Sequence, residues 1–170
     1  EIRHRIHMNP ETAMEEYETT KLIKEELLEM GAELQGIDID VGCVGLIKGT
    51  KPGKGKVIAI RCDIDALPMK DLCGKPWHSR KENAAHTCGH DAHTAALLGA
   101  AKALIQIRDK FSGTIKLVFQ PGEEGLHGAK VLVAKGVMEN PHVDLMVAMH
   151  NTPMYKLGQI ACAEGQIMAA

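Results

Sequence analysis

Aromatic residues are scarce in this chain: Phe, Trp and Tyr make up only 3% of its 170 residues. Such a sequence has little material for the base-stacking surfaces of nucleic-acid-binding proteins. The formal net charge of -2 adds no basic excess that would attract nucleic acid or an anionic membrane. No apolar run is long enough to cross a bilayer, and the given sequence opens with no signal-peptide pattern. We therefore expect neither a nucleic acid nor a membrane as a partner.

Paired cysteines and the common hydrolase motifs are also missing. The five cysteines are odd in number, scattered, and in no C-x-x-C pair, which predicts reduced thiols in a cytoplasmic protein. The chain has neither the H-E-x-x-H helix of many zinc proteases nor the G-x-S-x-G turn of serine hydrolases. Any catalytic chemistry must come from other side chains.

Hydrophobic residues (45%) and charged residues (25%) are present in the proportions of a soluble globular domain. The expected helices are residues 1–8, 15–30, 92–108 and 129–135. The expected strands are residues 44–48, 57–62, 114–120, 143–149 and 158–163. A Gly- and Lys-rich turn at 49–55 predicts that the first two strands pair as a hairpin. Strands alternating with helices predict an α/β sheet covered on both faces.

Residues 86–93 (HTCGHDAH) place three imidazoles, a thiol and a carboxylate directly before an almost wholly apolar helix. Thiolate and neutral imidazole are the donors that bind borderline-soft divalent metals. We expect Asp91 to cap the helix, with Cys88 and His90 in the turn around Gly89. The positive end of the helix dipole would favour a thiolate there.

Three expected strands end in further metal-binding side chains. Asp63 and Asp65 follow one strand, Glu123 and Glu124 follow another, and His150 follows a third. In open α/β sheets, ligands bind beyond the carboxyl ends of the strands. We therefore predict that these side chains meet Cys88 and His90 in one pocket.

Within this set, Cys88, His90, Glu124 and His150 offer sulfur, nitrogen and oxygen donors. Of two adjacent glutamates, one can bind metal while the other exchanges a proton with the activated water. Asp63 and Asp65 have the chemistry to orient a ligand imidazole. Asp91, His86 and His93 belong to or flank the cluster and are expected as supporting or cleft-lining groups.

Four segments resemble, in order, the motifs of the M20 family of metallopeptidases and amidohydrolases. They are residues 61–68 (RCDIDALP), 86–91 (HTCGHD), 119–125 (FQPGEEG) and His150 with Pro153. The resemblance is strongest to the branch that hydrolyses N-acyl amino acids, which includes hippurate hydrolase and the auxin-conjugate hydrolases. It implies a zinc-exopeptidase-like three-layer α/β domain with a mixed, mostly parallel sheet between helices.

The resemblance also implies a domain organisation. Residues 1–170 would be the N-terminal segment of the catalytic domain. A lid and dimerisation domain, through which the full-length protein would form a homodimer, and the C-terminal catalytic segment would lie outside this chain.

The family's residue roles carry over by motif. Cys88, His90, Glu124 and His150 match metal ligands, and Glu123 matches the general base and acid. Asp65, with Asp63 beside it, matches the aspartate that supports the metal site. Two divalent ions (zinc, manganese, cobalt or nickel), roughly 3.5–4 Å apart, would be bound and a small N-acyl amino acid would be the substrate.

Two other hypotheses remain open from the sequence. Four protein ligands around one zinc ion would make a closed structural site, and the chain would then be a non-catalytic metal-binding fragment. A third hypothesis is a thiol enzyme that uses Cys88 with His86 or His90.

Overall fold

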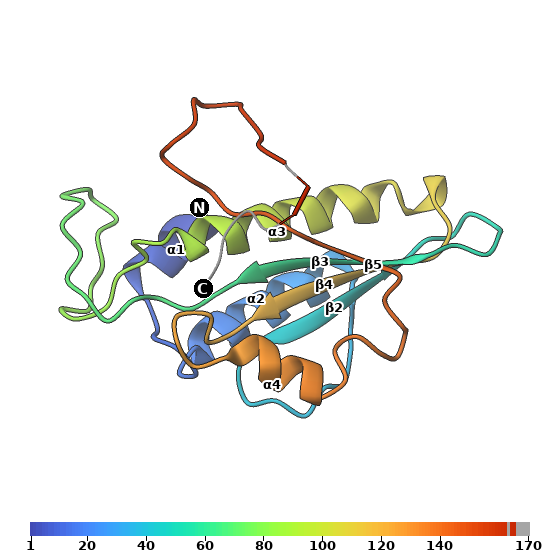
Figure 1. The fold of residues 1–170 in the computed structure, drawn as a ribbon, viewed down its shortest axis with the longest axis horizontal. Helices are drawn as coiled ribbons and strands as arrows, with labels where there is room; N and C mark the ends of the chain where they lie inside the picture. Colours follow the sequence, from blue (N-terminus) through green and yellow to red (C-terminus); the bar gives the residue numbers. More distant parts are fainter. Residues whose placement is uncertain (163, 166–170) are drawn as a thin grey trace.

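The computed structural model describes residues 1–162 and 164–165 and shows one mixed sheet between helices (Figure 1). The helices are α1 (Ile2–Met8), α2 (Tyr17–Met30), α3 (His90–Gln106), the short 3-10 helix η1 (Arg108–Lys110) and α4 (Gly128–Ala134). The strands are β1 (Glu33–Leu34), β2 (Cys43–Lys48), β3 (Val57–Asp63), β4 (Thr114–Gln120) and β5 (Leu145–Ala148). The predicted α/β class is confirmed.

The sheet has the strand order β1-β2-β4-β3-β5. β1 pairs antiparallel with β2 and β2 antiparallel with β4, whereas β3 pairs parallel with both β4 and β5. The predicted β2–β3 hairpin is therefore wrong, because β4 lies between these two strands. Because β3, β4 and β5 are parallel, their carboxyl ends lie at the same edge of the sheet. The predicted site residues come directly after these strand ends and therefore lie at this edge.

Each face of the sheet carries its own apolar core, so the domain has three layers (Figure 1). In β4, Leu117 and Phe119 point to the layer of α2 and α3, while Val118 points to the layer of α4. This alternation follows from the two-residue period of a strand. Ile23 and Leu27, four residues apart on α2, are fully buried on its inner face.

The four expected helices are present with ends within two residues of the expected ones, and one expected cap is wrong. Gly31 ends α2 in the left-handed conformation, with φ of 87°, and the helix ends at residue 30 as expected. α3 begins after Gly89, not Asp91, so the expected Asp91 cap is wrong. The Asp91 side chain binds Arg3 and His7 of α1 and makes no cap hydrogen bond to the α3 backbone.

Two strand predictions also need correction. The short strand β1 was not expected, since two residues carry no readable period. Residues 158–162 do not form the expected last strand, and residue 163 lies outside the described residues.

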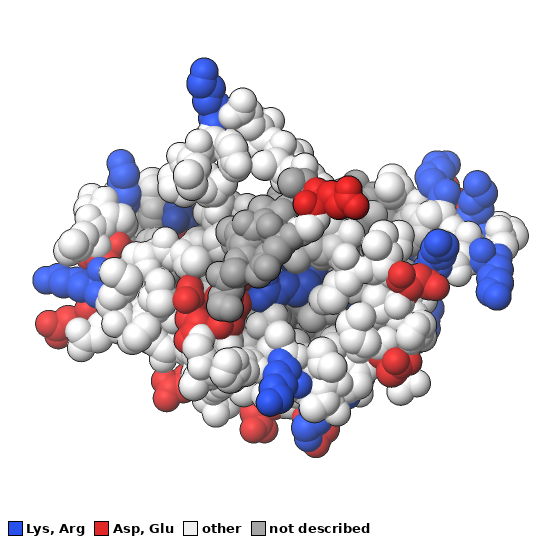
Figure 2. All heavy atoms as spheres, viewed as in Figure 1, with Lys and Arg blue, Asp and Glu red and all other residues white. Residues whose placement is uncertain are grey.

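Charged side chains of both signs are mixed on the face drawn in Figure 2, and Lys and Arg are more numerous toward the end where β2 and β3 are connected. No helix among residues 1–162 and 164–165 has the length and apolar character needed to span a bilayer.

Candidate metal centre

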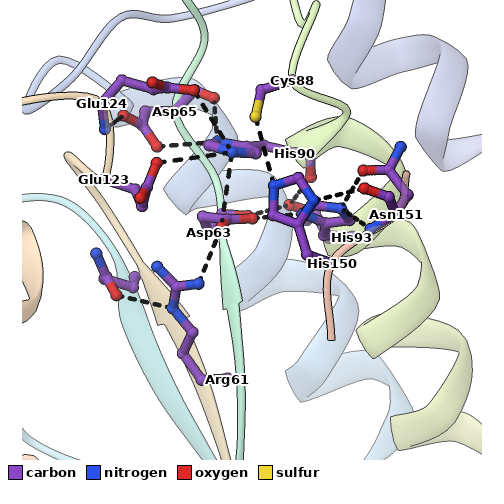
Figure 3. Close-up of polar contacts among 12 residues, drawn as sticks. Arg61, Asp63, Asp65, Cys88, His90, His93, Glu123, Glu124, His150 and Asn151 are labelled. Carbon is purple, nitrogen blue, oxygen red and sulfur yellow. Dashed lines mark hydrogen bonds and ion pairs between the residues drawn. The ribbon is translucent and has the colours of Figure 1, made fainter. Parts of the chain in front are cut away.

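The turn that opens α3 depends on Gly89. Its φ of 86° lies in the left-handed region, which residues with a Cβ rarely adopt. A Cβ on Gly89 would also collide with the side chain of Asn151. This turn places Cys88 and His90 beside the ends of β3, β4 and β5 (Figure 3).

His90 is fully buried, and its two ring nitrogens have different surroundings. Nδ1 lies 2.9 Å from the backbone oxygen of Asp65 and 3.1 Å from its Oδ1. Both partners are acceptors, so Nδ1 carries the proton and Nε2 has a free lone pair. Nε2 is buried and has no hydrogen-bond partner among the residues that the structure describes. An orphaned imidazole nitrogen held in this tautomer by a carboxylate is the arrangement of a metal ligand.

Three carboxylates surround the free Nε2 of His90. It lies 3.6 Å from Asp63 Oδ2, 3.8 Å from Glu124 Oε1 and 3.9 Å from Glu123 Oε2 (Figure 3). These distances are longer than hydrogen bonds and leave room for a cation between the groups. Glu123 and Glu124 are partly exposed, so the cluster opens to solvent on their side.

Cys88 and His150 complete the cluster. The Cys88 Sγ lies 3.4 Å from His150 Nε2, while His150 Nδ1 donates to the backbone oxygen of Asn151 at 2.6 Å. The donor atoms of Cys88, His90 and Glu124 all lie within 4.8 Å of one another, and those of His90 and His150 do as well. The structure thus brings together the four side chains predicted as ligands, although their role as ligands stays a prediction.

The Cys88 thiol differs from the expectation for a helix start. Burial and the nearby Glu124 carboxylate raise its pKa to about 12 instead of lowering it. A thiolate here needs an added positive charge, which a divalent cation supplies. The surroundings of Cys88 therefore suit a metal ligand better than a free nucleophile.

Asp63 is held in place by two basic side chains. His93 Nδ1 donates to its Oδ1 at 2.5 Å, and Arg61 donates to its Oδ2 at 2.9 Å. Burial raises the pKa of Asp63, but the hydrogen bond from His93 and the charges of His90 and Arg61 outweigh it and lower the pKa to about 2. The other ring nitrogen of His93, Nε2, lies 2.6 Å from Asn151 Oδ1 and 3.0 Å from the backbone nitrogen of Asn151. His93 thus orients Asp63, and protein groups contact both of its ring nitrogens.

The loop that carries the two glutamates is tied to two buried carboxylates. Asp65 Oδ2 accepts the backbone N–H of Glu124, and Glu16 Oε1 accepts that of Gly122, both at 2.8 Å. Burial raises the pKa of Glu16 to about 6. Asp65 therefore contacts both His90 and the glutamate loop, which suits it to positioning two predicted ligands at once.

Two residues expected near the site make contacts elsewhere. The carboxylate of Asp91 binds Arg3 and His7 of α1. His86 is buried with both ring nitrogens unpartnered within the described part of the chain, and burial lowers its pKa to about 4. Within the residues that the structure describes, neither side chain makes a hydrogen bond or ion pair with the four donors.

Sequence reasoning missed three residues of the site, namely Arg61, Asn151 and Glu16. Arg61 and Asn151 could have been found from their positions in the sequence. Arg61 lies two positions before Asp63, and Asn151 directly follows His150. Glu16 could not, since it lies more than 100 positions before the loop it binds.

Comparison with known proteins identifies the family of this chain. The family model for peptidase family M20/M25/M40 matches residues 59–166. The chain belongs to this family. The segment that matches the model includes every residue of the four-donor cluster.

Curated relatives of this M20 chain include several enzymes. It is 41% identical to hippurate hydrolase from Campylobacter jejuni over 99% of this chain and 43% of that protein. It is 40% identical to N-acetyl-L-cysteine deacetylase from Bacillus subtilis, over 99% of this chain and 40% of that protein. It is 44% identical to an IAA-amino acid hydrolase from Arabidopsis thaliana, over 99% of this chain and 38% of that protein. The chain spans less than half the length of these relatives.

Among solved structures, the M20 chain is similar to the YXEP protein of Bacillus subtilis, described as a dinuclear metal-binding peptidase. The TM-score is 0.85 at 39% identity, over 90% of this chain and 42% of that protein. The candidate metal centre thus lies in a fold that binds two metal ions in a relative.

Proposed function

We propose that the complete protein hydrolyses the amide bond of N-acyl amino acids at this centre. The observation that carries the proposal is the buried, unpartnered Nε2 of His90, which faces Glu124 and lies beside the Cys88–His150 pair. The names of the relatives support the substrate class, because a hippurate hydrolase, an N-acetylcysteine deacetylase and an IAA-amino acid hydrolase are among them.

Cys88, His90, Glu124 and His150 would hold two divalent ions, with further ligands from outside this chain. Zinc, manganese, cobalt and nickel all suit a mixed sulfur, nitrogen and oxygen donor set. When bound, such ions polarise the amide carbonyl and lower the pKa of a water molecule toward neutrality. The residues of this chain do the remaining work of orientation and proton transfer.

Glu123 is placed to move the proton. Its Oε2 lies 3.9 Å from His90 Nε2, at the partly exposed side of the cluster from which a substrate would enter. As general base, Glu123 takes a proton from the attacking water, and a bond forms between the water oxygen and the amide carbon. When the carbon–nitrogen bond breaks, Glu123 returns the proton to the leaving nitrogen, which yields a carboxylate and an amino acid.

Asp65 keeps Nδ1 of His90 protonated, so that Nε2 keeps its lone pair for the cation. Arg61 and His93 keep Asp63 ionised and fixed, which adds negative charge beside the cations. We place the reaction in the cytoplasm, in keeping with five free cysteines, and expect homodimerisation through parts of the protein outside this chain.

The test uses the complete protein and a panel of N-acetyl, N-benzoyl and indole-acetyl amino acids. At least one class should be hydrolysed, and Glu123→Gln should lower kcat by about a hundredfold or more while bound metal is unchanged. Glu29→Gln, at an exposed position on α2, is the matched control. Normal turnover by the Glu123→Gln variant would overturn the assigned role.

The two alternative hypotheses predict different results. A closed structural site predicts one tightly held ion in this cluster and no turnover of any substrate. A thiol enzyme predicts turnover that survives a chelator, whereas our proposal predicts that the chelator stops turnover and that added metal restores it.

A further inference from the structure

A second cluster of metal-binding side chains lies outside the candidate metal centre. It joins His7 of α1 to Asp71 and Cys73 of the long connection between β3 and α3, and the three donor atoms all lie within 4.8 Å of one another. None of these three residues belongs to the candidate metal centre. We propose that His7, Asp71 and Cys73 bind a zinc ion.

The distances among the three donors are close to those of a tetrahedral zinc site. His7 Nε2 lies 3.2 Å from Asp71 Oδ2 and 4.0 Å from Cys73 Sγ, and Sγ lies 3.4 Å from Asp71 Oδ2. Zinc bonds of about 2.0–2.3 Å at tetrahedral angles separate neighbouring donors by about 3.4–3.6 Å. Shifts of a few tenths of an ångström therefore bring the three side chains to ligand positions.

His7 is oriented as a ligand imidazole should be. Its Nδ1 donates to Asp91 Oδ2 at 2.7 Å, and Asp91 is fully buried. This contact directs Nε2 toward Asp71 and Cys73, as the contact with Asp65 does for His90 in the main centre. A carboxylate behind a ligand histidine fixes the tautomer and raises the basicity of the ring.

Asp71 is also held before any ion arrives. Its Oδ1 accepts the backbone N–H of Cys73 at 2.8 Å, and its Oδ2 accepts that of Ser79 at 2.7 Å. Two backbone donors leave further lone pairs on the carboxylate for a cation. The aspartate is thus fixed in the position where it faces both His7 and Cys73.

Charge favours a divalent cation here. One carboxylate from Asp71 and one thiolate from Cys73 balance the two positive charges of zinc, while Arg3 balances Asp91 at 2.6 Å. Cys73 is exposed, so an ion can enter from solvent and keep a water as its fourth ligand. The bound ion would fasten the connection at residues 71–79 to α1.

Protection of Cys73 from alkylation tests this site without relying on activity. The complete protein is stripped of metal and treated with iodoacetamide, with and without added zinc, and the rate of Cys73 modification is followed by peptide mass spectrometry. Zinc should slow this modification by about tenfold or more, because a bound thiolate is not free to react. Asp71→Asn should abolish the protection, whereas Asp109→Asn, at an exposed position, should keep it.

Two results would overturn the site. The first is a rate of Cys73 modification in the unsubstituted protein that does not depend on zinc. The second is equal protection in the Asp71→Asn variant, which would show that zinc binds the thiol alone. If Asp71→Asn fails to fold, the first result still decides.

Discussion

Asp65 binds the Nδ1 side of His90 twice, at 2.9 Å through its backbone oxygen and at 3.1 Å through Oδ1, and leaves Nε2 buried and free. The same carboxylate accepts the backbone N–H of Glu124 through Oδ2. One aspartate therefore fixes two predicted metal ligands that lie 34 positions apart in the sequence.

Asp65→Asn should weaken metal binding by about 10–100-fold, because a neutral amide fixes the His90 tautomer less strongly than a carboxylate does. The measurement is competition for zinc against a coloured chelator with the complete protein. Asp40→Asn, at an exposed position, is the control. Equal zinc affinity in the two variants would contradict the role of Asp65.

Glu16→Gln should change how stability depends on pH. The folded-state pKa of Glu16 is raised from 4.5 to about 6, so the unsubstituted protein loses stability as pH rises through this interval and does not regain it above pH 6. Glutamine keeps an oxygen for the Gly122 N–H and has no charge to bury. Relative to the unsubstituted protein, the variant should therefore gain about 2 kcal/mol between pH 4 and pH 7.

Thermal unfolding of the metal-free protein across this pH range measures the Glu16 effect. Comparison of the two proteins at each pH cancels any fixed cost of the substitution. Glu29→Gln, at an exposed position on α2, is the control. A stability difference that stays flat between pH 4 and pH 7 would show that Glu16 carries no raised pKa.

Lys116→Met should destabilise the layer of α4. The buried Nζ of Lys116 donates to the backbone oxygens of Val137, Glu139 and Pro141 at 2.8, 2.8 and 2.9 Å. Removing the ammonium leaves these carbonyls without their donor, at an expected cost of about 3 kcal/mol. Denaturant midpoints measure the loss against Lys102→Met, an exposed control on α3. Equal midpoints for the two variants would contradict this account.

The helices and central strands could be predicted because their signals are local. The apolar stripe of α2 ends at Gly31, and β3 and β4 are mostly apolar segments, each interrupted by one basic residue, that end at a polar residue. The same strand ends predicted which carboxylates and imidazoles would meet, since parallel strands open on one edge of a sheet.

Strand order could not be predicted from local signals. The turn at 49–55 has the composition of a hairpin, yet β3 pairs with β4, which is more than 50 residues later in the chain. The same limit applies to Asp91, whose sequence position favours a helix cap. Its partner His7 lies 84 positions away, and buried hydrogen bonds of this kind leave no pattern in the surrounding sequence.

The most direct test of the main centre is anomalous diffraction at the zinc edge from crystals of the complete, zinc-loaded protein. Our account predicts anomalous density bounded by Cys88 Sγ, His90 Nε2, Glu124 Oε1 and His150 Nε2. Anomalous density absent from this position, with the four side chains bonded only to one another, would contradict it.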